Sequence, residues 1–131
     1  MKNDNKLHCM IIEDNLQAAE IITIFFERNK ITSETAENGK IGLKMYFNNP
    51  LKYDAIFLDL EMPVMNGYET AKLIRESNIP ASDTIPIVAM SGTYTDSGVL
   101  KTSLFNYFIK KPFRINSLIG IIKEITKKKD N

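Results

Sequence analysis

Short apolar runs alternate along the chain with longer segments in which apolar residues recur at the spacing of one helix face. The short runs, together with one threonine-rich run, predict β-strands at Leu7–Ile12, Thr32–Ala36, Tyr53–Leu58, Ile85–Met90 and Asn106–Lys110. The longer segments predict helices at Leu16–Arg28, residues 39–48, Met65–Ser77 and Ile115–Ile125. Between Thr93 and Phe105, threonine, serine and glycine dilute the helical pattern, so a helix is favoured there only weakly. Alternating strands and helices are typical of βαβ units around a parallel sheet.

These elements predict one domain of the α/β class, built on a doubly wound five-stranded parallel sheet. A chain of 131 residues has the length of a single compact domain. We expect that domain over residues 7–126, between an N-terminal tail at 1–6 and a basic C-terminal tail at 127–131. The apolar fraction of 44% and charged fraction of 25% are typical of a soluble globular protein.

Charge and hydropathy argue against nucleic acid or a membrane as a partner. The net charge of +1 gives no overall field that would attract either surface. The N-terminus lacks the apolar core of a signal peptide, and no apolar run approaches the roughly 18 residues of a membrane span. We therefore expect a cytoplasmic protein.

Three single residues invite a functional interpretation that the sequence does not favour. Cys9 lies in an apolar run and is expected to be a buried, inert thiol. His8, the only histidine, is expected to be a core or edge-strand residue. Gly120 interrupts the last helix at a cost of about 1 kcal/mol relative to alanine, and we interpret it as a site of close packing.

Three acidic residues follow two of the predicted strands. Glu13 and Asp14 come directly after the first strand, and Asp59 comes directly after the third. Ligands of open parallel sheets bind at the carboxyl ends of the strands, so these carboxylates are expected to converge. Clustered carboxylates repel one another unless a cation or a proton lies between them. Their oxygens suit Mg²⁺, which usually takes one or two carboxylates together with phosphate and water.

Two further strand ends carry groups that bind anions. Ser91 is expected at the end of the fourth strand, and Lys111 follows the fifth. A hydroxyl, a backbone amide and an ammonium beside a metal-bound carboxylate suit phosphoryl transfer to that carboxylate. Such chemistry depends mainly on positioning and on neutralising the charge of the transferring oxygens. The sequence therefore favours Asp59 as an acceptor of a phosphoryl group.

These residues resemble the receiver domains of two-component signalling. The resemblance covers about residues 7–126 and is highly specific, because its motifs fall in order on successive strand ends. The motifs are Glu13 with Asp14, the segment from Asp59 to Gly67, Ser91 with Gly92, and Lys111 with Pro112 and Phe113. The resemblance implies a flavodoxin-like sheet in the order 2-1-3-4-5 with five helices.

The resemblance also implies a role for each acidic residue. Asp59 would be the nucleophile and phosphoacceptor. Glu13 and Asp14 would hold Mg²⁺, mainly through Asp14 and through water. Asp59 and the backbone carbonyl of Glu61 would complete the protein ligands of the metal.

The remaining motif residues would recognise the phosphoryl group and transmit its presence. Ser91 and Lys111 would each bond a phosphoryl oxygen, and Gly92 would keep the approach to it clear. The bond before Pro112 would be cis and would aim the lysine inward. Phe108 matches an aromatic switch position that turns inward when the serine moves.

At three positions the chain departs from the commoner residue of the family. Glu13 replaces aspartate and reaches one methylene further. Ser91 replaces threonine and keeps the hydroxyl. Phe108 replaces tyrosine, so its ring can pack inward but cannot form a hydrogen bond there.

The implied function is a phosphoacceptor switch rather than an enzyme acting on an independent substrate. A histidine kinase or histidine phosphotransfer protein would donate the phosphoryl group. A downstream protein effector, an attached domain or a phosphorylation-dependent homodimer would be the output. The chain could work alone or be part of a larger regulator or hybrid kinase, and the sequence leaves both open.

Three other classes of protein fit these residues less well. A pseudo-receiver usually lacks one of the key acids or the lysine, whereas Asp14, Asp59 and Lys111 are all present. A flavin-binding protein of this fold needs a loop rich in serine, threonine and glycine after the first strand, where this chain has two acids that would repel phosphate. A metal hydrolase would need a base such as histidine, and His8 lies inside the first strand.

Overall fold

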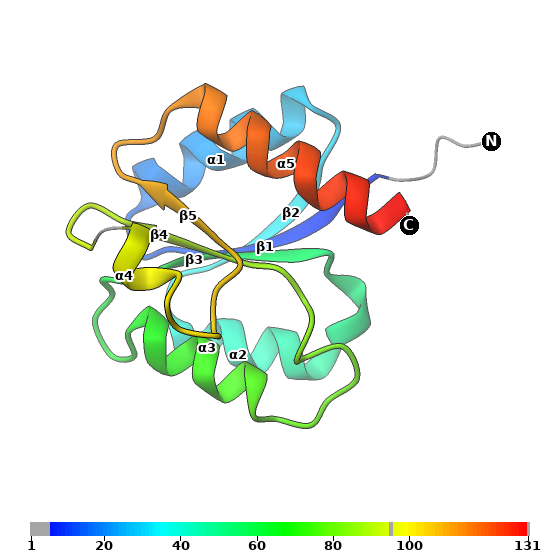
Figure 1. Ribbon diagram of the computed structural model, residues 1–131, viewed down its shortest axis with the longest axis vertical. Coiled ribbons are helices and arrows are strands. Elements are labelled where there is room, and N and C mark those ends of the chain that lie inside the picture. Colours follow the sequence, from blue (N-terminus) through cyan, green and yellow to red (C-terminus); the bar gives the residue numbers. More distant parts are fainter. Residues whose placement is uncertain (1–5, 95, 131) are drawn as a thin grey trace.

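The computed structural model describes residues 6–94 and 96–130, with only the backbone at Asp96. Strands and helices alternate along these residues (Figure 1). The strands are β1 (His8–Ile12), β2 (Thr32–Ala36), β3 (Ala55–Asp59), β4 (Ile87–Ser91) and β5 (Tyr107–Lys110). The helices are α1 (Leu16–Arg28), α2 (Gly39–Asn48), α3 (Gly67–Arg75), α4 (Asp96–Val99) and α5 (Ile115–Asp130), with a 3-10 turn at Pro50–Lys52.

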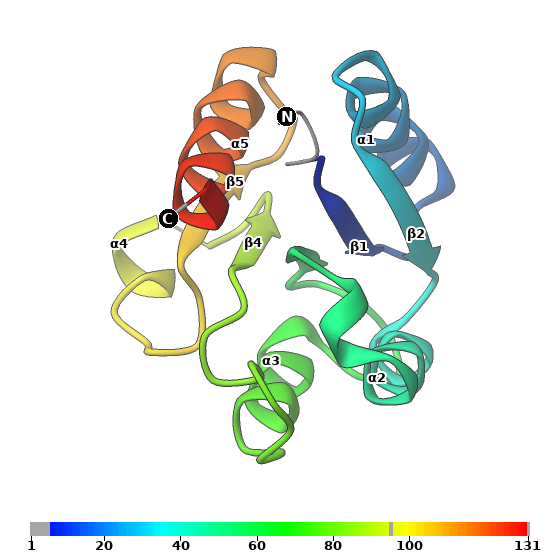
Figure 2. The same ribbon diagram turned by 90° about the vertical axis from the view of Figure 1, so that its right-hand side faces the viewer.

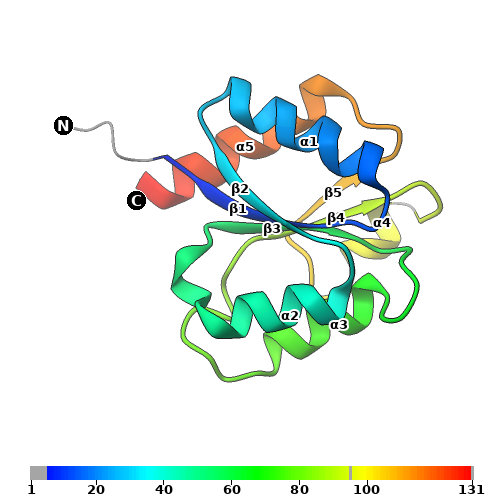
Figure 3. The ribbon, with the colours of Figure 1, turned by 180° about the vertical axis from the view of Figure 1, so that it is seen from behind.

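The five strands form one parallel sheet in the order β2-β1-β3-β4-β5, which confirms the predicted fold. Helices α1 and α5 cover one face of the sheet, and α2 and α3 cover the other (Figures 1 and 2). The same layers are visible from behind (Figure 3). Because every strand is parallel, the carboxyl ends of all five meet at one edge of the sheet.

Strict alternation along the central strands builds two separate cores. In β1, Met10 and Ile12 pack toward α2 and α3, whereas Cys9 and Ile11 pack toward α1 and α5. Strands β3 and β4 divide their side chains in the same way. Since both faces are covered, these strands are buried throughout and therefore appear in the sequence as continuous apolar runs.

The observed helix α3 is shorter at both ends than the predicted Met65–Ser77. Asn66 caps its start: the side chain accepts a hydrogen bond from Glu69 N at 2.9 Å, and Glu69 Oε1 accepts one from Asn66 N at 3.1 Å. This capping box was present in the sequence as asparagine followed by glutamate three residues later. It fixes where α3 begins, and with it the length of the loop after Asp59.

The fourth helix is a single turn, and a half-buried arginine holds the segment that follows it. Arg75, in the last turn of α3, donates to the carbonyl oxygen of Leu104 from Nε and Nη2 at 3.0 and 2.9 Å. The same guanidinium donates to the carbonyls of Ser82 and Ile85 and to Asn106 Oδ1. One side chain thus joins α3 to the segment before β4 and to the segment before β5.

One expectation about the last helix is wrong. A Cβ placed on Gly120 would meet no atom within 4 Å, so this glycine is not a site of close packing. Helix α5 runs to Asp130 with Lys127–Lys129 in its last turn, and the boundary between the domain and a basic tail stays a prediction. Of the predicted N-terminal tail, only Lys6 lies among the described residues. Within those residues, no helix is long and apolar enough to cross a membrane.

The contacts of Cys9 and His8 indicate structural rather than functional roles. Cys9 is fully buried, and burial raises the pKa of its thiol to about 12. His8 begins β1, a strand flanked on both sides, and its Nε2 lies 2.8 Å from Glu34 Oε2. The His8 ring also stacks on Tyr53 at 5.5 Å between centroids. Both residues lie toward the amino ends of the strands, away from the acidic residues.

Candidate functional site

Four neighbouring strands bring the predicted site residues together at one edge of the sheet. Glu13 follows β1, Asp59 ends β3, Ser91 ends β4 and Lys111 follows β5. The register sets Asp59 beside Met90 and Ser91 beside Lys110. These four strands are adjacent in the sheet order, so residues far apart in sequence become spatial neighbours.

Three carboxylates form a compact acidic group. Glu13, Asp14 and Asp59 each offer an oxygen, and the three oxygens lie within 4.8 Å of one another. Glu13 and Asp59 are only 1% and 2% exposed, whereas Asp14 faces solvent. Two ionised carboxylates buried this closely require positive charge or a shared proton.

Lys111 supplies part of that positive charge. Its Nζ lies 2.7 Å from Glu13 Oε1 and 3.3 Å from Asp59 Oδ2. Burial alone would lower the pKa of Lys111, but the hydrogen bonds to the two carboxylates and their charges outweigh it and raise the pKa. The lysine therefore stays charged.

The single positive charge of Lys111 does not balance the negative charges of two buried carboxylates, and the pKa of Asp59 is raised as a result. Burial raises the pKa of Asp59 to about 7, and the hydrogen bond and charge of Glu13 add to the effect. The backbone N–H of Glu61, which donates to Asp59 Oδ1 at 3.0 Å, and the charge of Lys111 oppose the rise. Without a further cation, the buried pair thus retains a proton up to near-neutral pH.

This donor set fits a hard divalent cation. Carboxylate oxygens with one solvent-facing member suit Mg²⁺, which keeps several waters when it binds proteins. A cation here would also supply the positive charge that Lys111 alone leaves incomplete. Mg²⁺ would be held by Glu13, Asp14 and Asp59.

The loop between β3 and α3 is held tightly against the end of β3. A Cβ on Gly67 would lie 2.5 Å from the carbonyl oxygen of Asp59 and 2.8 Å from Leu60 Cα, so only glycine fits. In the same loop Val64 has a φ of 71°, and Met65 N donates to Pro63 O at 2.8 Å, which makes a tight γ-turn. The chain can therefore return to α3 within a few residues of Asp59.

The side chain of Glu61 accepts hydrogen bonds from two groups at the end of β4. Ser91 Oγ donates to Glu61 Oε2, and Gly92 N donates to Glu61 Oε1 at 3.3 Å. The family resemblance implies a role only for the backbone carbonyl of Glu61, so this side-chain contact is not predicted from the sequence. An exposed acid two residues after Asp59 carries no pattern that distinguishes it from a solvated surface glutamate.

The remaining site residues lie as follows. The Lys111–Pro112 peptide bond is cis. A Cβ on Gly92 would lie 3.8 Å from Lys111 Cβ, an ordinary contact, so the space beside Gly92 is limited but not closed. Phe108 is partly buried and packs against the core on the α2–α3 side of the sheet. Its role as a switch stays a prediction.

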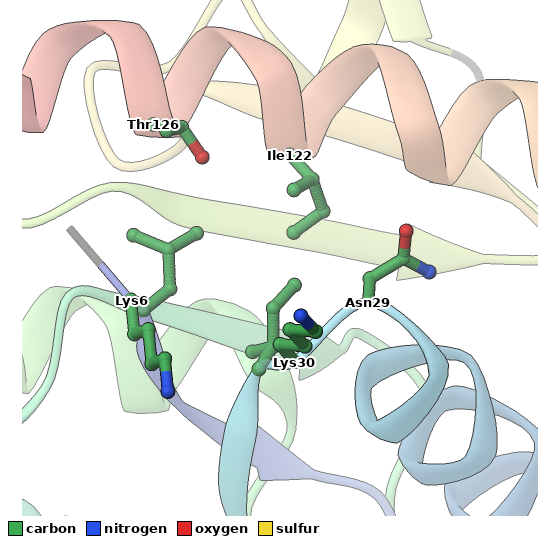
Figure 4. A pocket seen from close by; sticks show the side chains of 7 residues that line it. Lys6, Asn29, Lys30, Ile122 and Thr126 are labelled. Carbon is green, nitrogen blue, oxygen red and sulfur yellow. The ribbon is translucent and has the colours of Figure 1, made fainter. Parts of the chain in front are cut away.

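A separate cavity of about 410 Å³ lies at the amino ends of β1 and β2 (Figure 4). Its labelled lining residues come from the chain before β1, the turn after α1 and helix α5: Lys6, Asn29, Lys30, Ile122 and Thr126. It shares no residue with the Asp59 site, which lies at the opposite ends of the strands.

Relatives of known family share both the sequence pattern and the fold. Residues 9–123 match the response regulator receiver domain family. The chain is 27% identical over 125 residues to two-component response regulator 24 of Arabidopsis thaliana, covering 93% of this chain and 86% of the plant protein. It is 30% identical over 122 residues to sensor histidine kinase AtsR of Burkholderia thailandensis, covering 91% of this chain but only 20% of the kinase.

The fold is similar to solved structures of response regulators. A two-component response regulator from Clostridium difficile superimposes with a TM-score of 0.82 at 25% identity, covering 96% of this chain and 100% of that one. The chemotaxis protein CheY4 of Vibrio cholerae, at 20% identity, shares the fold with a TM-score of 0.81 over 92% of this chain and 98% of its own. Since the family pattern spans most of the chain and lies on the matching fold, the protein belongs to the response regulator receiver domain family of two-component signalling.

Proposed function

We propose that Asp59 accepts a phosphoryl group, with Mg²⁺ as cofactor, and that the modified domain changes its interaction surface. The donor would be a histidine kinase or a histidine phosphotransfer protein. The partner that recognises the changed surface would be a downstream protein or a domain attached to the receiver. The chain would then act as a signalling switch and not as an enzyme with an independent substrate.

In the transfer step, a carboxylate oxygen of Asp59 attacks the phosphorus of the donor. A new O–P bond forms while the bond from phosphorus to the donor breaks, and the leaving group departs with the electron pair. A departing imidazole takes up a proton, whereas acetyl phosphate releases acetate. Lys111, within 3.3 Å of Asp59, is suited to pair with the charge of the transferred group. Bound Mg²⁺ would supply neutralisation of charge on the transferring oxygens.

One observation carries this proposal: two acidic side chains, Glu13 and Asp14 after β1, and the ammonium of Lys111 after β5 converge on Asp59 at the end of β3. A purely structural ion pair would need one acid for Lys111. The additional buried carboxyl raises the pKa of Asp59, which is costly to stability and is typical of a functional site.

The test is incubation of the protein with acetyl phosphate and Mg²⁺, followed by measurement of the intact mass. We expect the wild type to gain one phosphoryl group and Asp59→Asn to gain none. Asp83→Asn, which changes an exposed aspartate outside the site, is the matched control and should behave as wild type. Equal mass gain by Asp59→Asn, or gain by the wild type in excess chelator, would refute the proposal.

A further inference from the structure

We propose that the Glu61 carboxylate is an internal competitor of the phosphoryl group, holding Ser91 and Gly92 until phosphorylation displaces it. The two hydrogen bonds from Ser91 Oγ and Gly92 N to the Glu61 carboxylate are called the Glu61 clamp here. The inference rests on the proposed function, because it concerns groups that would bind the phosphoryl oxygens.

The hydrogen-bonding capacity of Ser91 is fully used in the clamp. A hydroxyl has one proton to donate and two lone pairs that accept. Ser91 Oγ accepts from Thr93 N at 3.0 Å and from Tyr94 N at 2.8 Å, and donates its proton to Glu61. It has no second proton to offer, so it cannot bond a phosphoryl oxygen while Glu61 stays in place.

The amide of Gly92 is engaged in the same way, since its N–H points to the other oxygen of Glu61. Two donors of β4 and its end therefore hold one carboxylate, in the manner in which they would hold a phosphoryl group. Phosphorylation adds a charge of about −1.5 to −2 and three acceptor oxygens. A carboxylate sharing the same donors with that group would be repelled, so Glu61 must leave before Ser91 can turn to it.

Breaking the clamp would also affect the segment after β4. The same hydroxyl that donates to Glu61 anchors the backbone of Thr93 and Tyr94. The Tyr94 ring packs edge-on against Tyr68 at 5.5 Å, and Tyr68 packs against Phe105 at 5.3 Å. A movement of Ser91 would therefore pull on an aromatic group that joins α3 to the chain before β5.

The clamp predicts a measurable gain when Glu61 is shortened. At saturating Mg²⁺, Glu61→Ala should take up phosphoryl groups from acetyl phosphate at least tenfold faster than wild type, and Glu61→Gln should be intermediate because it keeps one acceptor without the charge. Glu37→Ala is the control for charge alone: Glu37 is exposed after β2, at the same edge of the sheet. It should stay within twofold of wild type.

A second measurement separates this inference from the proposed function. Without any phosphoryl donor, amide NMR shifts of Gly92, Thr93 and Tyr94 should change in Glu61→Ala and not in Glu37→Ala. Unchanged shifts, or uptake by Glu61→Ala no faster than wild type, would overturn the clamp. A wild type that gains no phosphoryl mass would instead overturn the proposed function, and the NMR shifts would still decide whether the contact exists.

Discussion

Asp59→Asn should make the metal-free protein more stable at high pH, although it removes the proposed phosphoacceptor. The reason lies in the buried pair of carboxylates at Glu13 and Asp59. In the unfolded chain Asp59 loses its proton near pH 3.8, whereas in the folded protein burial beside Glu13 raises the pKa to about 7. Between these values the unfolded state releases the proton and the folded state keeps it. The free energy of unfolding therefore falls as pH rises, and levels off above about pH 7.

The size of the effect follows from the same pKa values. Each pH unit between them corresponds to about 1.4 kcal/mol, so the full difference from 3.8 to about 7 sets an upper limit of about 4 kcal/mol. An asparagine has no proton to lose and escapes this cost. Between pH 5 and pH 7 alone, the stability of the variant relative to wild type should rise by about 2–3 kcal/mol.

The assay is urea unfolding of wild type and Asp59→Asn at pH 5 and at pH 8.5, with divalent cations removed by chelation. Asp83→Asn serves as the control and should follow wild type within about 0.5 kcal/mol at both pH values. Excess Mg²⁺ at pH 8.5 should stabilise wild type but not Asp59→Asn, because only a ligand that binds the folded state shifts the equilibrium. A constant stability difference between the two proteins across this pH range would refute the reasoning.

Three further substitutions test how the fold supports the site, each by urea unfolding. Gly120→Ala should stabilise the protein by about 0.5–1 kcal/mol, because the added methyl meets no atom within 4 Å and favours the helix. Gly67→Ala should destabilise it by about 3 kcal/mol, because the new Cβ would collide with the Asp59 carbonyl. Arg75→Ala should cost about 3 kcal/mol by leaving the carbonyls of Ser82, Ile85 and Leu104 without their donor. Changes of the opposite sign would contradict each assignment.

The position of the acidic site could be predicted because it depends only on topology. Buried apolar runs mark the strands, and a polar residue directly after such a run must lie at the carboxyl edge of a parallel sheet. That rule applies to Glu13, Asp59 and Lys111. In the structure, Lys111 Nζ lies 2.7 Å from Glu13 Oε1 and 3.3 Å from Asp59 Oδ2. It needed no knowledge of how the loops run.

The features that could not be predicted depend on loop geometry and on exposure. The prediction for Gly120 is wrong for another reason. Gly120 is two residues from Leu118 and from Ile122, so the helical spacing places it on the face opposite the apolar one, where nothing packs against it. The fourth helix is short because Gly98 and neighbouring polar residues weaken it, yet the Arg75 hydrogen bonds that hold the following segment involve backbone carbonyls that leave no trace in sequence.

The contact of Glu61 could not be predicted because Glu61 is exposed and because the contact depends on the path of a loop. Its side chain reaches Ser91 only because the loop after Asp59 turns sharply at Val64 and starts α3 at Gly67. A longer loop would move the Glu61 carboxylate away from Ser91 and Gly92. The steric demand at Gly67 and the Glu61 contact are therefore linked: the close approach that excludes a side chain at Gly67 also holds an acid next to the hydroxyl of Ser91. Under the proposed function, the loop that positions Asp59 also positions the Glu61 carboxylate that a phosphoryl group on Asp59 would have to displace.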